Sequence, residues 1–352
     1  MRRLTVVSVG YPLAAVGLDA VGGSEQVLTA LDRALVAAGH RSIVVAMDGS
    51  RAEGQLVTYP APPPGPIAPE TFELQRARAG EALRRVLAAP ADVVHMHGLD
   101  FHCYLPPPGP PVLATLHLPP DWYPKAAYDI ARPNTWIQCV SETQMRRTAP
   151  NSRMLPPIPN GVPVAELGAT RRRRRRFAMM LARVCPEKGM HLALQAAREA
   201  DCDLLIGGEI FPYQAHRDYF IQEVQPLLDC RRRWLGPLGF ERKRRLLAEA
   251  RCLLVPSLVA ETSSLVAMEA ASCGTPVIAF DQGALAEVVE HGVTGLIVDG
   301  VAGMADAIGR VGEIDPEACR QAARARFSLE RMTAAYFARY QALADASITQ
   351  AA

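Results

Sequence analysis

Residues 253–279 read LLVPSLVAETSSLVAMEAASCGTPVIA. The run opens with a short apolar stretch at Leu253–Val255, continues with a helix-forming stretch at Ser264–Ser272, and closes with a second apolar stretch at Val277–Ala279. Apolar strands that alternate with helices indicate a parallel sheet covered on both faces. The segment therefore predicts an α/β fold for this part of the chain.

The same alternation extends along the chain in both directions. In the second half, a strand at 177–182 precedes a helix at 188–200, a strand at 204–206, a strand ending at Trp234 and a helix at 242–250. In the first half, a helix from Gly22 to Ala38 separates strands at 4–10 and 42–47, and further strands are expected at 93–97, 112–117 and 136–140. Each half therefore predicts a doubly wound sheet.

The length of the chain predicts two domains, because one hydrophobic core usually stops growing at about 250–300 residues and this chain has 352. The boundary is expected in the region 156–176, which is rich in proline and then in arginine. We expect an N-terminal domain at 1–165 and a C-terminal domain at 166–326. Ligands bind at the carboxyl edges of such sheets, so a cleft between the two domains is the expected site.

Composition excludes several classes of protein. With 49% hydrophobic and 21% charged residues, the composition is that of a folded chain and not of a disordered one. A net charge of +2 produces no field strong enough to indicate a nucleic-acid partner. The eight cysteines form no CxxC pair, which favours reduced thiols in the cytoplasm. The uncharged run Leu4–Leu18 contains Gly10, Pro12 and Gly17 and is too short to cross a membrane. No transmembrane segment is expected, and peripheral membrane contact stays open.

Glu261 and Glu269 lie on either side of the expected helix start at Thr262–Ser264. A helix N-terminus binds phosphate through its free N–H groups and its dipole, so a diphosphate fits between the two glutamates. Glu269 would lie about 8–10 Å along the helix, which is the reach from a diphosphate to a ribose. Glu261 would lie at the other end, where a transferred sugar needs hydroxyl acceptors.

An ordered set of motifs resembles the retaining family-four glycosyltransferases, whose donor motif is a glutamate, seven residues and a second glutamate. The resemblance extends over nearly the whole chain. The matching motifs are Gly22-Gly23-Ser24-Glu25, Asp92–His97, His117, Asn160-Gly161-Val162, Leu181–Gly189, Gly236–Gly239, Gly274–Ile278 and Gly292–Leu296. The resemblance implies a GT-B fold, two Rossmann-like domains facing a central cleft, and a last helix at about 327–346 that returns to the first domain.

The resemblance also implies the roles of individual residues. Arg183 and Lys188 neutralise the leaving diphosphate, Glu261 contacts the transferred sugar, Glu269 contacts the ribose, and His117 lies near the donor sugar. The remaining donor-binding residues are implied to be Gly22, Gly23, Gly208, Leu238, Thr262, Ser263, Ser264 and Leu265. Many family members have a glycine shortly after the first glutamate, where this chain has Thr262-Ser263-Ser264. The family reaction uses no metal, no cofactor and no protein nucleophile.

The sequence therefore predicts a cytoplasmic retaining hexosyltransferase and leaves peripheral contact with a membrane open. The expected donor is a nucleoside diphosphate sugar, with a UDP-sugar favoured and a GDP-sugar open. The expected acceptor is a sugar, a lipid-linked compound or a small molecule bound by the N-terminal domain. Two alternatives are a GT-B epimerase or phosphorylase-like enzyme, which needs no sugar acceptor, and a non-catalytic protein that binds nucleotide sugars.

Two sets of residues, one of histidines and one of arginines, are open to a second interpretation. His95, His97, His102 and His117 could suggest a metal cluster, but no carboxylate spacing completes a site, and we expect His95 to be a core or a hydrogen-bonded residue. The run Arg171–Arg176 could bind an anionic lipid, a phosphorylated acceptor or nucleic acid. We favour a solvated loop, which is the usual state of a short run of like charges.

Overall fold

The computed structural model describes residues 2–63, 65, 67–169 and 172–351. The chain forms two compact units, and each is described by itself. Unit 1 contains Met1–Pro159 and Glu330–Ala352, and unit 2 contains Asn160–Leu329. The sequence places the same division after residue 165.

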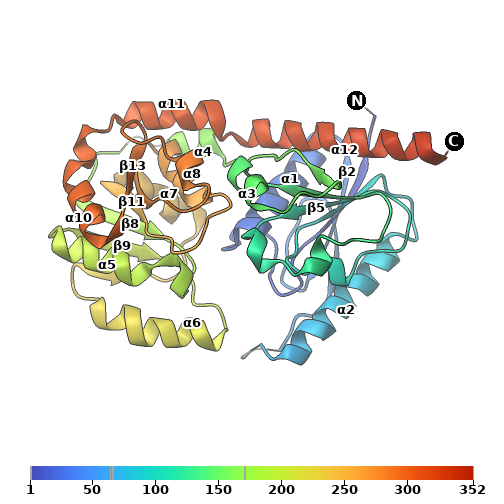
Figure 1. Ribbon diagram of the computed structural model, residues 1–352, viewed down its shortest axis with the longest axis horizontal. Helices are drawn as coiled ribbons and strands as arrows, with labels where there is room; N and C mark the ends of the chain where they lie inside the picture. Colours follow the sequence, from blue (N-terminus) through green and yellow to red (C-terminus); the bar gives the residue numbers. More distant parts are fainter. Residues whose placement is uncertain (1, 64, 66, 170–171, 352) are drawn as a thin grey trace. The chain divides into compact units, whose positions relative to one another are not determined.

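Unit 1 is built on a parallel sheet, seven-stranded among the described residues, with the order β3-β2-β1-β4-β5-β6-β7 (Figure 1). Its strands are β1 (Thr5–Val9), β2 (Arg41–Met47), β3 (Gln55–Tyr59), β4 (Val93–Met96), β5 (Val112–Leu116), β6 (Thr135–Cys139) and β7 (Met154–Leu155). Its helices are α1 (Gly23–Ala37), α2 (Pro69–Val86), α3 (Glu142–Arg147) and α12 (Leu329–Ala351). Strands β4 and β5 are buried along their whole length, which explains why their sequences are apolar except for His95 and Thr115.

Unit 2 repeats this plan with a parallel sheet, six-stranded among the described residues, in the order β10-β9-β8-β11-β12-β13. Its strands are β8 (Phe177–Leu181), β9 (Asp203–Gly207), β10 (Arg232–Trp234), β11 (Cys252–Val255), β12 (Val277–Phe280) and β13 (Gly295–Val298). Its helices are α4 (Val164–Gly168), α5 (Met190–Glu199), α6 (Gln214–Tyr219), α7 (Phe240–Glu249), α8 (Leu265–Ser272), α9 (Leu285–Val288), α10 (Gly300–Arg310) and α11 (Pro316–Arg326).

Both sheets reverse their strand order at one place, between β1 and β4 in unit 1 and between β8 and β11 in unit 2. Ligands of open α/β sheets bind outside the carboxyl ends of the strands that flank such a reversal. In unit 2 the loops that leave β8 and β11 contain the predicted residues Arg183, Lys188 and Glu261. The topology therefore brings these predicted residues to the expected edge of the sheet.

Helix α12 ends the chain but belongs to unit 1 (red in Figure 1). Its Tyr336 and Tyr340 side chains are fully buried, and the Tyr340 hydroxyl lies 2.7 Å from Nδ1 of His95 on β4. Arg339 donates a hydrogen bond of 2.8 Å to Oε1 of Gln138 on β6. The core of unit 1 is therefore completed by the last helix.

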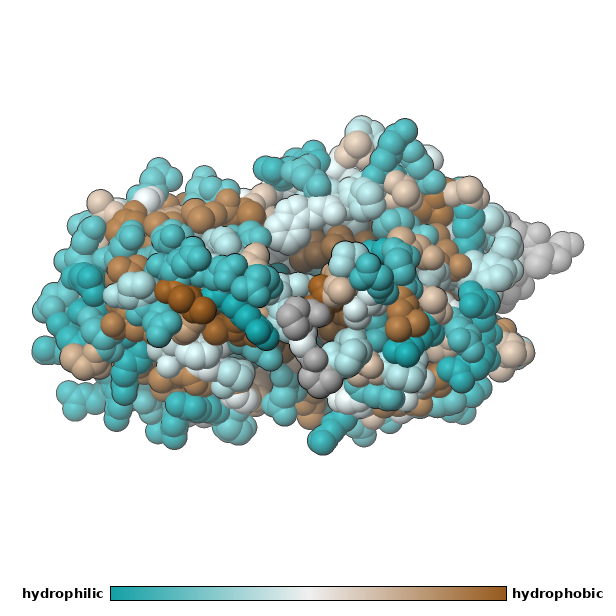
Figure 2. Space-filling model, turned by 90° about the horizontal axis from the view of Figure 1, so that it is seen from below, coloured by the Kyte–Doolittle hydropathy of each residue, from teal (hydrophilic) through white to brown (hydrophobic). Residues whose placement is uncertain are grey.

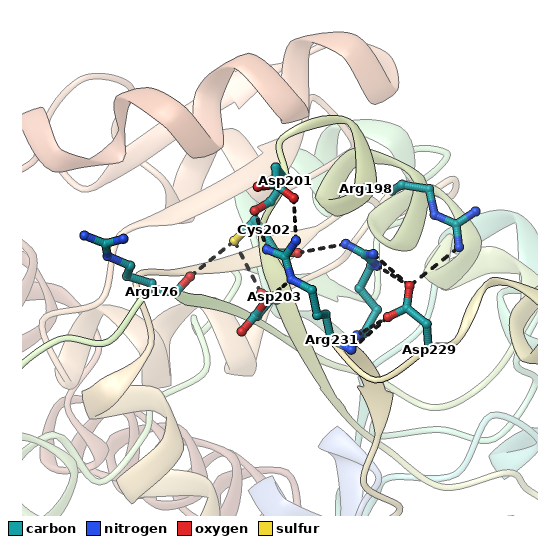
Figure 3. A network of polar contacts seen from close by, with 8 residues as sticks. Arg176, Arg198, Asp201, Cys202, Asp203, Asp229 and Arg231 are labelled. Atoms are coloured by element: carbon teal, nitrogen blue, oxygen red, sulfur yellow. Dashed lines mark hydrogen bonds and ion pairs between the residues drawn. The ribbon is translucent and has the colours of Figure 1, made fainter.

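The opposite edge of the unit 2 sheet, where β9 and β10 begin, is held by ion pairs (Figure 3). The Arg231 guanidinium contacts Asp203 at 2.5 Å and also pairs with Asp201. The Asp229 carboxylate accepts hydrogen bonds from Arg232 at 2.7 and 2.9 Å. Because these groups are at the amino ends of the strands, we assign them to the stability of the sheet.

Hydrophilic residues predominate on the surface seen in Figure 2, and hydrophobic residues occur there in small groups. Most large hydrophobic side chains lie in the two cores, and the few exposed ones, such as Leu18 and Ile221, are far apart in sequence. None of the described helices has both the length and the hydropathy that a membrane-spanning helix needs.

Candidate functional site

The loop after β8 positions the two predicted cations, Arg183 and Lys188. The Arg183 guanidinium lies over the ring of Phe211, 5.5 Å from its centroid, a distance typical of a cation–π contact. Lys188 ends the 3-10 turn Pro186–Lys188, and Gly189 follows in the left-handed region at φ 62°. A Cβ atom on Gly189 would lie 2.2 Å from the Pro256 carbonyl oxygen, so this turn requires glycine.

Lys188 and Glu261 form an ion pair between the loops that leave β8 and β11. Nζ of Lys188 lies 2.5 Å from Oε1 of Glu261, with side-chain exposures of 24% and 10%. The backbone of Glu261 is fixed separately, because its carbonyl accepts a hydrogen bond of 2.7 Å from the Ala284 N–H. The structure therefore joins two residues that are 73 positions apart in the sequence.

Helix α8 begins at Leu265, directly after Thr262, Ser263 and Ser264. Ser264 is the N-cap, and its side chain makes no capping hydrogen bond to the helix. The hydroxyl of Ser263 is buried and has no hydrogen-bond partner among the described residues. An unpaired buried hydroxyl is unfavourable by about 1–3 kcal/mol, so a ligand that accepts or donates a hydrogen bond here would be stabilising.

Glu269 is nearly buried in the second turn of α8 and pairs with a lysine that the sequence did not indicate. Nζ of Lys243 on α7 lies 2.5 Å from Oε1 of Glu269, with side-chain exposures of 16% and 4%. Because α8 begins at Leu265, Glu269 lies only about 6 Å along the helix from its first residue. The expectation of 8–10 Å was too long because it started the helix at 262–264.

The chain has three lysines, and two of them pair with the two predicted donor-site glutamates. This scarcity is a signal in the sequence that could have directed attention to Lys243. The third lysine, Lys125, has a side chain that is 90% exposed and pairs with Asp129 on the surface of unit 1.

Gly208 and Leu238 lie together at the end of β9, beside the loop that contains Arg183. The Gly208 N–H donates to the Gly236 carbonyl, and its carbonyl accepts from the indole N–H of Trp234. A Cβ atom on Gly208 would lie 1.8 Å from the Ala182 carbonyl oxygen. The Leu238 side chain packs against Gly207. The structure therefore gives both residues a packing role, and their contact with a donor stays a prediction.

Gly22 and Gly23 open helix α1 in unit 1, where Gly22 is the N-cap in an extended conformation. The carboxylate of Glu25 folds back over this turn, because a Cβ atom on Gly22 would lie 1.9 Å from its Oε2. Ser24 donates a hydrogen bond of 2.9 Å to the same carboxylate. The absence of a side chain at Gly22 therefore leaves room for the Glu25 carboxylate at the start of α1. The contact of Gly22 and Gly23 with a donor stays a prediction.

His117 belongs to a stack of histidines in unit 1. Its Nε2 lies 3.0 Å from Nδ1 of His97, and the two rings are stacked at 5.2 Å between centroids. Nε2 of His97 is buried and has no partner among the described residues. His95 is buried and contacts Tyr340 and Thr115 through its two nitrogens, so the prediction of a core or hydrogen-bonded residue is confirmed in both respects. The sequence did not indicate that His97 orients His117.

Burial lowers the pKa of His117 to about 4 and places those of His95 and His97 well below 6.5. The unfolded chain then binds protons more readily than the folded one, so stability is constant above pH 6.5 and falls on acidification toward pH 4. We expect unfolding free energy to drop by about 2 kcal/mol between pH 6.5 and 5 from His117 alone. Urea unfolding at several pH values measures this slope. His117→Gln should reduce this slope.

The arginine run is attached to unit 2, and the prediction of a solvated loop is wrong for part of it. Arg174 is half-buried and donates hydrogen bonds to the carbonyl oxygens of Ala250 and Gly274. Arg172 and Arg175 pair with Glu249 at 3.2 and 3.5 Å. Arg171 lies outside the described residues. Arg174 is therefore anchored at the start of the sheet, whereas Arg172, Arg173, Arg175 and Arg176 are exposed to solvent.

One group of metal-ligating side chains was missed altogether. Among the described residues, the structure assembles a single set of three such groups with ligand atoms within 4.8 Å of one another: Cys185, Glu187 and His216. None of the four histidines weighed from the sequence belongs to it. Cys185 and Glu187 are close in sequence, but His216 is on a different helix, so no spacing rule could have joined them.

Two family descriptions match the chain. Residues 21–166 match "Glycosyltransferase Family 4", and residues 175–313 match "Glycosyl transferases group 1". A D-inositol 3-phosphate glycosyltransferase from Mycolicibacterium smegmatis is 31% identical over 179 residues, which is 48% of this chain and 41% of that protein. The matches span between 28% and 41% of the length of the curated relatives considered.

Solved structures share the fold over almost the whole chain. Sucrose-phosphate synthase from Thermosynechococcus elongatus has a TM-score of 0.76 at 21% identity and covers 98% of this chain and 100% of its own. Anabaena HepE, solved in complex with UDP and glucose, has a TM-score of 0.72 at 16% identity and covers 96% of this chain and 100% of its own. The α/β, GT-B fold expected from the sequence is confirmed.

Proposed function

We infer the function from one premise, that this chain belongs to the family-four glycosyltransferases of group 1. We propose that it transfers a hexose from a nucleoside diphosphate sugar to an acceptor, with retention of anomeric configuration and without a metal ion or cofactor in the reaction. The observation that carries the proposal is the Lys188–Glu261 pair beside the N-terminus of α8.

The proposed donor site lies along the loops that leave β8 and β11. The diphosphate would bind at the start of α8, where the N–H groups of the first turn have no partner within the helix and the unpaired Ser263 hydroxyl points to a ligand. Arg183 and Lys188 would neutralise the charge that develops on the leaving diphosphate. Lys188 is already held in place by Glu261, so it needs only a small reorientation toward the phosphate.

Each glutamate would bind one end of the donor. Glu261 would accept hydrogen bonds from hydroxyl groups of the transferred sugar, and Glu269 would accept hydrogen bonds from those of the ribose. Lys243 occupies one of the roughly four acceptor positions of the Glu269 carboxylate and holds that carboxylate in its orientation. The acceptor oxygen would attack from the face that the diphosphate leaves, and a donor phosphate oxygen would take its proton. No protein nucleophile is required.

A UDP-sugar is the donor we favour, with a GDP-sugar as the second candidate. HepE, which shares the fold, was solved in complex with UDP and with UDP-glucose. We propose a sugar, lipid-linked or small-molecule acceptor bound by unit 1 near Gly22, Gly23 and His117. The eight cysteines are all free, which supports a reducing, cytoplasmic location, with peripheral membrane contact as a further possibility.

A thermal-shift panel of UDP-, GDP-, ADP- and dTDP-sugars tests the donor site. A ligand that binds only the folded state at 100 times its Kd raises the unfolding free energy by about 2.7 kcal/mol, so the correct donor should raise Tm clearly above the other three. The shift should disappear in Glu269→Gln. Equal Tm values with and without all four sugar nucleotides would contradict the proposal.

Incubation with the donor alone separates transfer from its main rivals. A GT-B epimerase would convert the free sugar nucleotide to its epimer, and a phosphorylase-like enzyme would require phosphate. Without a sugar acceptor, we expect neither the epimer nor any turnover of the donor that depends on phosphate. A non-catalytic binding protein would shift in the thermal panel but release no nucleoside diphosphate with any acceptor mixture.

A further inference from the structure

A cluster of three metal-ligating side chains lies next to the proposed donor site but is not used by it. Cys185 precedes the turn Pro186–Lys188, Glu187 lies within that turn, and His216 lies on α6. The thiol, carboxylate and imidazole ligand atoms are all within 4.8 Å of one another. Cys185 is 2% exposed, and the other two side chains are half-buried.

The chemistry of this set selects one class of metal ion. A thiolate and an imidazole exclude Mg²⁺ and Ca²⁺, which prefer oxygen ligands, and a thiolate, imidazole and carboxylate together suit Zn²⁺. Bonds of about 2.0–2.3 Å in a tetrahedral site place ligand atoms about 3.3–3.6 Å apart. The three side chains therefore need to approach one another by at most about 1.5 Å, which side-chain rotation can supply.

His216 supplies a second, independent observation. Its Nδ1 is buried and has no hydrogen-bond partner among the described residues. The ring is held against Phe211 and Tyr213, with centroid distances of 6.4 and 5.1 Å. A buried nitrogen without a hydrogen-bond partner is unfavourable unless a ligand binds to it.

We propose that Cys185, Glu187 and His216 bind one Zn²⁺ ion. On binding, the Cys185 thiol loses its proton to solvent and the thiolate sulfur forms the bond to zinc. One thiolate, one carboxylate and a neutral imidazole balance the two positive charges of the ion, so no net charge is buried. Three protein ligands leave the fourth tetrahedral position for water or an anion.

The position of the ion gives it a structural consequence within unit 2. It connects α6 to the turn that ends at Lys188, and Phe211, which supports the Arg183 guanidinium, lies against His216. Zinc would therefore fix the loop that presents both cations of the proposed donor site. The ion is not a participant in the sugar transfer, and the site does not depend on the proposed function.

Titration of the chelator-treated full chain with ZnCl2, in competition with a chromophoric chelator, tests the site. We expect one zinc ion per chain and a rise in Tm, because zinc would bind only the folded arrangement. Cys185→Ser and His216→Gln should each weaken binding at least about 100-fold, since even loss of an outer-shell partner typically weakens a site 10–100-fold. CoCl2 in place of zinc should give a sulfur-to-metal charge-transfer band that is absent in Cys185→Ser.

Cys103→Ser is the matched control, because Cys103 and His102 form another thiol–imidazole contact, at 3.4 Å. This variant should bind zinc like the unaltered chain. Circular dichroism of each metal-free variant establishes that it is folded, and His216→Gln alters only a half-buried side chain. The proposal would be overturned if the unaltered chain bound no zinc, if Cys185→Ser and His216→Gln retained full affinity, or if Cys103→Ser lost it. None of these outcomes bears on donor binding.

Discussion

We expect Lys188→Ala to lower kcat/KM for sugar transfer by at least about 100-fold. Removal of one preorganised group that stabilises developing negative charge typically lowers kcat by about 10²–10³. Lys188 is a strong candidate because Glu261 holds its ammonium group at the carboxyl end of the sheet, 2.5 Å from a carboxylate that is itself fixed through its backbone. Initial rates over a range of donor concentrations measure the change.

Lys125→Ala is the control for this experiment. Lys125 has the same charge and length, but its side chain is 90% exposed and pairs with Asp129 on the surface of unit 1. Its replacement should leave both kcat and KM unchanged. If the two lysine variants transferred sugar at equal rates, the assignment of Lys188 to the diphosphate would be wrong.

We expect Glu269→Gln to affect stability and donor binding together. Loss of one partner of a buried ion pair typically destabilises a protein by about 3–5 kcal/mol, because the other charge stays buried without compensation. Here Lys243, whose side chain is only 16% exposed, would lose its ion-pair partner. The same substitution removes the proposed acceptor of the ribose hydroxyls, so donor affinity should fall. Urea unfolding and donor titration measure the two effects separately.

Two further variants separate these effects. Glu241→Gln removes a carboxylate from the same helix as Lys243, but Glu241 is 76% exposed, so its loss should change stability by less than about 1 kcal/mol. The double variant Lys243→Met with Glu269→Gln removes the unpaired charge. It should regain stability without regaining donor affinity. Recovery of donor affinity in the double variant would contradict the ribose role.

The parts of the fold that were predicted correctly have strong local signals. Strands β8 and β11 are buried on both faces, so four or five consecutive apolar residues identify them. Strand β3 was missed because it lies at the edge of the sheet and only its last residue, Tyr59, is buried, so it has no continuous apolar run. Strand β13 was missed because its four residues begin with Gly295, which breaks the apolar pattern.

The candidate site shows the same division between local and distant signals. Glu261 and Lys188 follow buried strands in recognisable motifs, so the sequence could single them out. Lys243 lies on a helix whose other residues are mostly charged, and nothing local distinguishes a lysine that points at a buried carboxylate from one that points at solvent. The partners of Arg174 are main-chain carbonyl groups, which any sequence position could supply.

The hydrogen bond between His95 and Tyr340 sets an order of events during synthesis of the chain. These residues are separated by 245 positions, and at about 5–20 residues per second the ribosome takes roughly 12–50 seconds to pass from one to the other. Until then, the nascent first sheet has no partner for this imidazole and no cover for the surface that Tyr336 and Tyr340 later bury. The second sheet can fold as soon as residue 329 has emerged. The domain that is made first is therefore the one that is finished last.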